Sequence, residues 1–443
     1  MEQTKIQFIG GLDTIGGNIV SIEHGNYRII TDFGAQVGAS IEDQLSQDLF
    51  ESLLSEGKLP RVHGVYAQEN LIHTEDIQAF EDSEKETIVC LSHLHIDHIG
   101  SLKHLVPEIP IFALADVAPF YELLVENHLL PDYDFSIQGV EPKEILEFGP
   151  FNIRFFESDH DTIGAASLFI ESPDLKIVYS GDLRLTGFHP ERVMRWALEA
   201  RDWGTDVLLL EGTSFSFDDR EVSIEELAIE SLTQPLGIQS EGQGINEFSK
   251  ILSQNQQACI TFNGYPQNVE RMVQWLMIAK SQGRQCVIQA DMFDLVRPFL
   301  SSEDQIEVYS LDNLSMYQAQ PERYFIQVND SDLSWLTIDS KGIYLHSNGM
   351  PLGYYMPGYA VYVRAIVDAG WTFVQAGISG HANKEDLLML AYLIQPQILV
   401  PWHTFNRQAF SEALQSRGLR TWLPELHETF STEEIRRLMN KEL

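Results

Sequence analysis

Hydrophobic residues make up 44% of the 443 residues and charged residues 21%, which is ordinary for a folded globular protein and excludes a mostly disordered, collagen-like or coiled-coil chain. The 29 Lys and Arg against 65 Asp and Glu give a net charge of −36, which argues against non-specific binding to nucleic acid or to an anionic membrane. Three widely spaced cysteines, the lack of an apolar run of roughly 18 residues and the lack of a signal peptide lead us to expect a cytoplasmic protein without a membrane-spanning segment.

Short strand-like runs separated by turn residues dominate the first half of the chain. We predict one helix there, over 41–56, because Leu45, Leu49 and Leu53 recur at four-residue spacing and Gly57 ends the pattern. The remaining runs predict a mixed sheet that is rich in hairpins. The predicted strands lie at 5–9, 18–23, 27–32, 87–91, 150–157, 165–170, 175–180 and 206–211.

Regular alternation of strands and helices follows an acidic, polar stretch at 214–226, which we interpret as a crossing between two domains. This alternation is typical of a parallel sheet covered by helices. The predicted strands are 258–262, 285–290, 324–328, 342–346, 371–375 and 398–402, and the predicted helices are 267–282, 291–300, 358–369, 384–394 and 405–417.

A cluster of histidines and an aspartate follows the predicted strand 87–91. His93 and His95 are two residues apart, so in an extended chain their side chains project to the same side. The chain then turns, and Asp97 and His98 can face a second centre nearby. Imidazole and carboxylate ligands suit zinc and similar divalent ions. With only 14 His in the chain, such a cluster is rare by chance, and it predicts metal binding.

Three more candidate ligands directly follow apolar strands: His160, Asp182 and His403. Each alone is more often a capping or surface residue, but together they form a set at strand ends. Two ions that lie close together need a bridging carboxylate and an open position for water.

These motifs resemble a known family. The string HLHIDH resembles the HxHxDH motif of the metallo-β-lactamase superfamily, and other stretches resemble its β-CASP branch, which contains nucleases such as ribonuclease J. The resemblance extends over residues 10–403. The further matching stretches are 10–18, 31–34, 159–164, 180–182, 209–213, 268–274, 378–382 and 401–403.

The resemblance implies two divalent metal ions, with Zn²⁺ expected and Mn²⁺ as the alternative. Asp182 would bridge the two ions, and Asp32 would hydrogen-bond a ligand histidine and fix its tautomer. The implied ligands are His93, His95 and His160 for one ion, Asp97, His98 and His403 for the other, and Asp182 for both.

The resemblance also implies hydrolysis of a phosphodiester by a metal-bound hydroxide, with Asp97 among the catalytic residues. His381 would contact the scissile phosphate and help to protonate the leaving 3′ oxygen, and Glu211 would orient His381 or share its proton. Ser347 and Gly353 lie in a stretch that resembles the family's substrate loop and would bind phosphate without formal charge.

The implied function is an RNA-degrading or RNA-processing nuclease. Its expected substrate is single-stranded RNA. His403 favours RNA over DNA, because it stands where the DNA-acting branch usually has an apolar residue. We expect no membrane partner and leave a homo-oligomer open.

We expect an α/β fold in which a metallo-β-lactamase αββα sandwich, residues 1–215 and 378–443, is interrupted by a β-CASP parallel-sheet domain at 216–377. The insertion would explain how distant ligands meet in one site, at the floor of a cleft between the domains.

Two other interpretations stay open. A hydrolase of a small ester or phosphodiester would use the same metals, and the acidic composition favours it, although the motifs after 208 and the inserted domain count against it. A non-catalytic binding subunit would have lost ligands, whereas all seven positions are filled.

Overall fold

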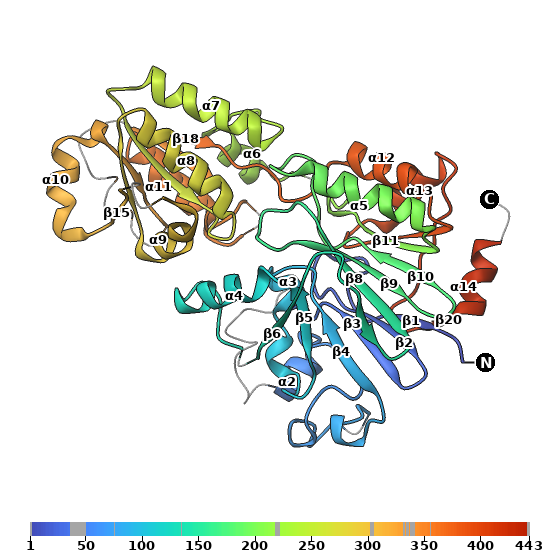
Figure 1. The fold of residues 1–443 in the computed structure, drawn as a ribbon. Helices are drawn as coiled ribbons and strands as arrows, with labels where there is room; N and C mark the ends of the chain where they lie inside the picture. The colour runs from blue at the N-terminus through green and yellow to red at the C-terminus, as the bar shows by residue number, and fades with distance from the viewer. Residues whose placement is uncertain are drawn as a thin grey trace.

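The computed structural model describes residues 2–35, 50–74, 76–133, 135–217, 222–301, 305–330, 333, 336, 342–354 and 356–440. Within these residues the chain forms two mixed sheets and one all-parallel sheet, each flanked by helices. In Figure 1 the mixed sheets make up the body on the right and the parallel sheet makes up the body on the left. This architecture confirms the predicted α/β fold class, an αββα sandwich with an inserted parallel-sheet domain of the β-CASP kind.

The first mixed sheet carries the N-terminus and the start of the histidine cluster. Its β1 to β3 are antiparallel neighbours, and β3 to β6 are parallel neighbours. In spatial order it contains β20 (Thr429–Ser431), β1 (Lys5–Phe8), β2 (Val20–His24), β3 (Tyr27–Thr31), β4 (Glu86–Cys90), β5 (Ile111–Leu114) and β6 (Ile137–Val140).

The second mixed sheet joins the middle of the chain to its C-terminal part. Parallel pairing of β19 with β11 brings residues almost 200 positions apart into register, for example Leu208 with Leu399. In spatial order it contains β19 (Ile398–Trp402), β11 (Val207–Glu211), β10 (Lys176–Tyr179), β9 (Ala166–Glu171), β8 (Phe151–Glu157) and β7 (Leu146–Phe148).

Alternation along the strands divides the core of the sandwich into two layers. In β11, Val207 and Leu209 face the first sheet, whereas Leu208 and Leu210 pack on the outer helices. Successive side chains of a strand point to opposite faces of the sheet, so a strand buried on both faces contributes alternate residues to two separate cores.

The third sheet is all-parallel, and helices bury both of its faces. Phe248 and Trp275 cover one face, and Tyr362 and Trp371 cover the other. Its strands extend from 233 to 375, and the predicted domain limits at 216 and 377 stay a prediction. In spatial order it contains β12 (Thr233–Pro235), β18 (Thr372–Gln375), β17 (Gly342–Ser347), β13 (Cys259–Gly264), β16 (Tyr324–Gln327), β14 (Gln285–Ile288) and β15 (Glu307–Val308).

The C-terminal helices return to the sandwich after the third sheet. Figure 1 shows α12 and α13 beside α5, on the outer face of the second sheet. The helices are α2 (Phe50–Ser55), α3 (Ile96–Ile99), α4 (Val117–Glu126), α5 (Pro190–Trp203), α6 (Ile224–Glu230), α7 (Glu241–Gln254), α8 (Val269–Ser281), α9 (Ala290–Val296), α10 (Leu314–Ala319), α11 (Tyr359–Asp368), α12 (Lys384–Ile394), α13 (Arg407–Gln415) and α14 (Thr432–Met439).

The predicted elements agree with the observed ones to within a few residues, with some differences. Residues 41–49 of the predicted first helix lie outside the described residues, and α2 covers its end. The acidic stretch at 214–226 was predicted as a crossing, but its end forms the start of α6, where the Ser223 side chain caps the helix.

Several elements were not predicted, and α5 and α7 are the longest of them. The sequence of α5 nevertheless carries helix signals, with Pro190 in its first turn and Gly204 in the left-handed conformation after its last residue. Among the described residues, none of the helices is both long enough and apolar enough to cross a membrane.

Packing of α12 on the sandwich can be tested by paired substitutions. Leu387 is fully buried in the cluster that contains Trp196 of α5, whereas Met389 on the same helix is 40% exposed. Leu387→Ala should therefore lower the free energy of unfolding by about 2–5 kcal/mol. Met389→Ala should change it by no more than about 0.5 kcal/mol. Urea denaturation measures both, and equal effects would contradict this packing.

Candidate metal centre

The candidate site residues come from one edge of the sandwich. Several strands of the two mixed sheets end there, and a polar residue follows or completes each of them. Because parallel strands present their carboxyl ends at the same edge, these side chains converge although they are far apart in the sequence. They are Asp32 after β3, His93 after β4, His160 after β8, Asp182 after β10, Glu211 at the end of β11 and His403 after β19.

The backbone at this edge is bent so that side chains point inward. Asp32 and His403 have positive φ angles of 56° and 51°, which are uncommon for residues other than glycine. Gly181, just before Asp182, has a φ of 57°, and a Cβ on it would lie 2.6 Å from the Ala166 carbonyl oxygen. A side chain at position 181 would therefore displace the turn that carries Asp182.

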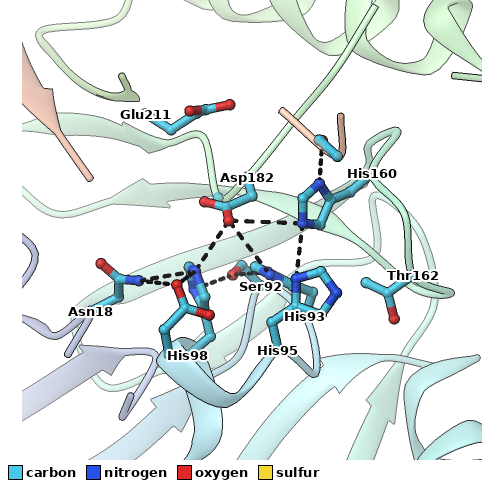
Figure 2. Close-up of polar contacts among 12 residues, drawn as sticks. Asn18, Ser92, His93, His95, His98, His160, Thr162, Asp182 and Glu211 are labelled. Carbon is cyan, nitrogen blue, oxygen red and sulfur yellow. Dashed lines mark hydrogen bonds and ion pairs between the residues drawn. The ribbon is translucent and has the colours of Figure 1, made fainter. Parts of the chain in front are cut away.

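Asp182 lies at the centre of the cluster. Its Oδ2 is 3.3 Å from His98 Nε2, 3.7 Å from His93 Nε2 and 3.8 Å from His160 Nε2, and Figure 2 shows these three rings turned toward it. On the far side, Oδ2 lies 3.7 Å from His403 Nε2. One carboxylate is thus within reach of two sets of ligand atoms.

Two groups of ligand atoms share Asp182, and all seven predicted ligands belong to them. Within each group the ligand atoms lie within 4.8 Å of one another. The first group contains His93, His95, His160 and Asp182, and the second contains Asp97, His98, Asp182 and His403.

Four of the five ligand histidines have a partner on the nitrogen that faces away from the cluster. Such contacts set the tautomer, so that the inner nitrogen offers its lone pair. The outer contacts join His93 Nδ1 to Ser92 Oγ (2.9 Å), His98 Nδ1 to Asp32 Oδ2 (2.8 Å), His160 Nδ1 to the Gly380 carbonyl oxygen (2.5 Å) and His403 Nδ1 to Thr213 Oγ1 (2.7 Å).

The cluster leaves several buried polar atoms without partners in the described part of the chain. They include Nε2 of His93 and Oδ1 of Asp182, both inside the first group. Buried polar atoms are normally satisfied, so lone pairs that converge without donors are typical of a site for a cation. The residues therefore fit a binuclear metal site.

Burial favours the neutral form of the three histidines in the first group. It lowers the pKa of His93 and His95, and it lowers the pKa of His160 to about 3. These rings are therefore neutral at pH 7, and metal ligation requires the neutral form. Burial opposes protonation of His98 too, but Asp182, Asp97 and Asp32 outweigh it and raise the pKa of His98.

His381 and Glu211 lie beside the two groups. His381 Nδ1 is 3.5 Å from Glu211 Oε1 and 3.7 Å from Asp182 Oδ2. The His381 side chain is 25% exposed, whereas that of Glu211 is fully buried. Burial opposes protonation of the ring, but the carboxylates of Glu211 and Asp182 outweigh burial and raise the pKa of His381 to about 9.

The predicted phosphate loop lies in the parallel-sheet domain. Ser347 ends β17 and is fully buried, and its hydroxyl accepts a hydrogen bond from Arg271 (3.3 Å). Gly353 lines a cavity of about 200 Å³ with His346 and Tyr359, and the residues around that cavity include none of the seven candidate ligands. A phosphate-binding role for Ser347 and Gly353 stays a prediction.

A buried chain of charges connects the two bodies next to the centre. Glu241 of α7 contacts Arg184 at 2.9 Å and Arg271 of α8 at 2.7 Å, and all three side chains are at most 2% exposed. Arg184 also contacts Asp159, the neighbour of His160 (3.2 Å). Arg271 reaches the Ile378 carbonyl oxygen at 3.1 Å, close to His381. The chain of charges therefore holds the inserted domain against the candidate ligands.

A cavity of about 310 Å³ lies between the same elements. His160, Arg184 and Arg192 line it from the sandwich. Glu270 of α8 and Asn268, which caps α8, line it from the other side. This places a hollow between the two bodies and beside the first ligand group.

Two residues of the centre, Asn18 and Asp161, lie in stretches that match the family, but the sequence assigned them no role. Asn18 donates through Nδ2 toward His98 Nε2 (3.0 Å) and Asp97 Oδ2 (3.3 Å), and Figure 2 shows it on the side of His98. Asp161, directly after His160, lies 3.4 Å from His160 Nε2. Its position after a candidate ligand at a strand end was the available sequence signal.

Comparison with known proteins agrees with this geometry. The family described as "Beta-lactamase superfamily domain" matches residues 62–233. The matched region contains the histidine cluster, His160, Asp182 and Glu211.

The chain contains a metallo-β-lactamase superfamily domain.

More distant similarity extends beyond the region that the family model matches. Ribonuclease J of Pyrococcus abyssi is 21% identical over 422 residues, which cover 90% of this chain and 89% of that protein. Ribonuclease J of Mycobacterium tuberculosis is 23% identical over 423 residues, covering 90% and 68%. A crystal structure of a protein of unknown function from Enterococcus faecalis V583 superposes with a TM-score of 0.79 at 27% identity, covering 97% of this chain and 100% of that one.

Metal binding by this metallo-β-lactamase-fold protein can be tested by dialysis followed by metal analysis. The wild-type protein should hold two divalent ions per chain. Asp182→Ala should weaken both sites because Asp182 belongs to both groups. His403→Ala should weaken one. Removal of the ions by a chelator should lower the melting temperature, since an ion at 100 times its dissociation constant stabilises the fold by about 2.7 kcal/mol. Loss of a single ion from Asp182→Ala would contradict the shared position.

The buried charge chain predicts a large effect on stability. Glu241→Gln leaves Arg184 and Arg271 buried without their shared counter-charge, so the free energy of unfolding should fall by about 3–5 kcal/mol. Glu247→Gln, on the same helix, removes only a surface pair with Lys250 and should cost at most about 1 kcal/mol. Denaturant unfolding followed by circular dichroism compares the two variants, and similar losses would refute the structural role of Glu241.

Proposed function

We propose that this metallo-β-lactamase-fold hydrolase is a metal-dependent phosphodiesterase that degrades or processes RNA, as ribonuclease J does. The observation that carries the proposal is the joint placement of two ligand groups around Asp182 with the His381–Glu211 pair beside them. Distant similarity to ribonuclease J over nine-tenths of the chain supports RNA as the substrate.

The two metal positions suit attack on a phosphodiester. Two divalent ions held by the seven ligands would activate a water and neutralise charge on the phosphate oxygens. Imidazole is the main ligand type of both groups, which favours Zn²⁺, with Mn²⁺ as the alternative. The outer contacts of His93, His98, His160 and His403 hold these rings in place before any ligand arrives, which limits reorganisation.

We assign His381 the role of proton donor to the leaving 3′ oxygen. The neighbouring carboxylates, Glu211 first, raise the pKa of His381, which favours a protonated ring that can deliver a proton. Its partial exposure lets it reach a substrate, while the buried Glu211 holds the ring from behind. Glu211 is itself positioned, because its Oε2 accepts a hydrogen bond from the Thr213 backbone N–H at 3.0 Å.

The net charge of −36 means that most of the protein surface cannot attract RNA, so binding would depend on a few local positive charges. RNA would have to be held by the metal ions and by the few basic side chains near the cleft, such as the half-buried Arg192 at the 310 Å³ cavity. Phosphate contacts of this kind position a backbone without reading its sequence. We therefore propose a nuclease that recognises single-stranded RNA through few ionic contacts.

The role of His381 predicts a specific loss of activity. His381→Ala should lower the rate of cleavage of end-labelled 5′-phosphorylated RNA by about 10²–10⁴-fold, because a positioned proton donor is removed. The variant should still bind two ions, since His381 belongs to neither group around Asp182. His427→Ala, at an exposed position, is the control and should keep wild-type activity. RNA cleavage at wild-type rates by His381→Ala would refute the assignment.

A second candidate function is hydrolysis of a small ester or phosphodiester by the same centre. The net charge of −36 favours it, because an acidic protein repels a long polyanion more than a small substrate. The metal-loaded protein can be given single-stranded RNA and bis-p-nitrophenyl phosphate in parallel, with Asp97→Ala as the inactive control for both. Cleavage of RNA supports the nuclease. Hydrolysis of the small diester with RNA left intact would establish the second candidate instead.

A further inference from the structure

His95 differs from the other ligand histidines in the way its ring is placed. Its Nδ1, rather than its Nε2, faces the first group, at 3.0 Å from His160 Nε2, and Figure 2 shows the two rings in contact. The outer nitrogen of His95 is therefore Nε2. In the described part of the chain this atom is buried and accepts or donates no hydrogen bond.

Asp161 supplies the carboxylate nearest to that nitrogen. Its Oδ1 lies 3.7 Å from His95 Nε2, and the residue is only 8% exposed. Among the described residues, Oδ1 of Asp161 also has no hydrogen-bond partner. A buried carboxylate without a partner is costly, and so is a buried ring N–H. The two unsatisfied atoms are therefore complementary and face each other.

The surroundings hold Asp161 in this position. A Cβ on Gly380 would lie 2.3 Å from Asp161 Oδ1, so the turn at 378–381 passes directly over the carboxylate. The carbonyl oxygen of the same glycine accepts the hydrogen bond from His160 Nδ1. Gly380 thus covers Asp161 and orients His160, and only a residue without a side chain leaves room for both.

We propose that Asp161 is a positioning residue of the first metal site, whose carboxylate accepts a hydrogen bond from Nε2–H of His95 when an ion is bound. The inference rests on the binuclear metal site of the proposed function. An ion on Nδ1 leaves the proton on Nε2, and a shift of about 0.7 Å closes the gap to the roughly 3.0 Å of a hydrogen bond. His95 then has an outer partner, as the other four histidines do.

This contact has a chemical consequence for one ion only. A carboxylate that accepts from a ligand imidazole fixes the ring orientation and raises the basicity of the ligating nitrogen, and loss of such a partner lowers metal affinity by about 10–100-fold. Asp161 contacts His95 and His160 of the first group, so the second group should be unaffected.

The test compares Asp161→Asn with wild-type protein and with Asp116→Asn. Asp116 is exposed and lines the cavity beside His160, so its variant removes one nearby negative charge without touching the ligands. Competition with a chromophoric chelator measures the affinity of each Zn²⁺ site, and the absorption spectrum of Co²⁺-loaded protein reports coordination number.

The expected result is a 10–100-fold weaker affinity at one of the two sites in Asp161→Asn, with no loss in Asp116→Asn. The Co²⁺ spectrum should keep its coordination number, because Asp161 is not itself a ligand. The melting temperature of the chelator-treated variant should not fall, because the contact forms only with the ion.

Three outcomes would overturn the proposal. Two unchanged affinities would show that Asp161 does not support His95. A changed coordination number would make Asp161 a ligand instead. A fall in melting temperature without metal would make the role purely structural. A wild-type protein that binds fewer than two ions would overturn the binuclear site of the proposed function as well, and this result is distinct from the other three.

Discussion

Convergence on the Asp182 carboxylate is the constraint on which the rest of the structure depends. Four ligand nitrogens from both mixed sheets and from the C-terminal segment lie within 3.3–3.8 Å of its Oδ2. Such crowding of lone pairs is unfavourable without cations, so the surrounding fold must hold the side chains in place. The outer contacts of the histidines, the positive φ angles of Asp32 and His403 and the tight turn at Gly181 all serve this placement.

The inserted parallel sheet acts on the centre through buried charge and through a single turn. Glu241 joins Arg184 of the sandwich to Arg271 of α8, and Arg271 binds the carbonyl oxygen of Ile378. The same turn then brings Gly380 over His160 and carries His381 to Glu211. Any motion of the inserted domain would therefore reach His381 through the turn at 378–381.

The acidity of the chain and the proposed RNA substrate are compatible on physical grounds. An acidic protein repels a polyanion at long range, which weakens non-specific binding. At short range, two divalent ions and the protonated His381 would concentrate positive charge at the scissile phosphate. Binding would then depend on the loaded centre rather than on a basic surface, which gives selectivity for substrates that can enter the cleft.

The sequence by itself determined the ligand types, the fold class and the approximate element bounds, because HxHxDH spacing and strand periodicity are local signals. It also carried the resemblance that assigned His160, Asp182 and His403 to one centre. Only the tertiary structure decided which nitrogen of each histidine faces inward, that Asn18 and Asp161 join the centre, and that Glu241 bridges two arginines. These facts depend on distances between segments up to several hundred residues apart, and no local pattern encodes such distances.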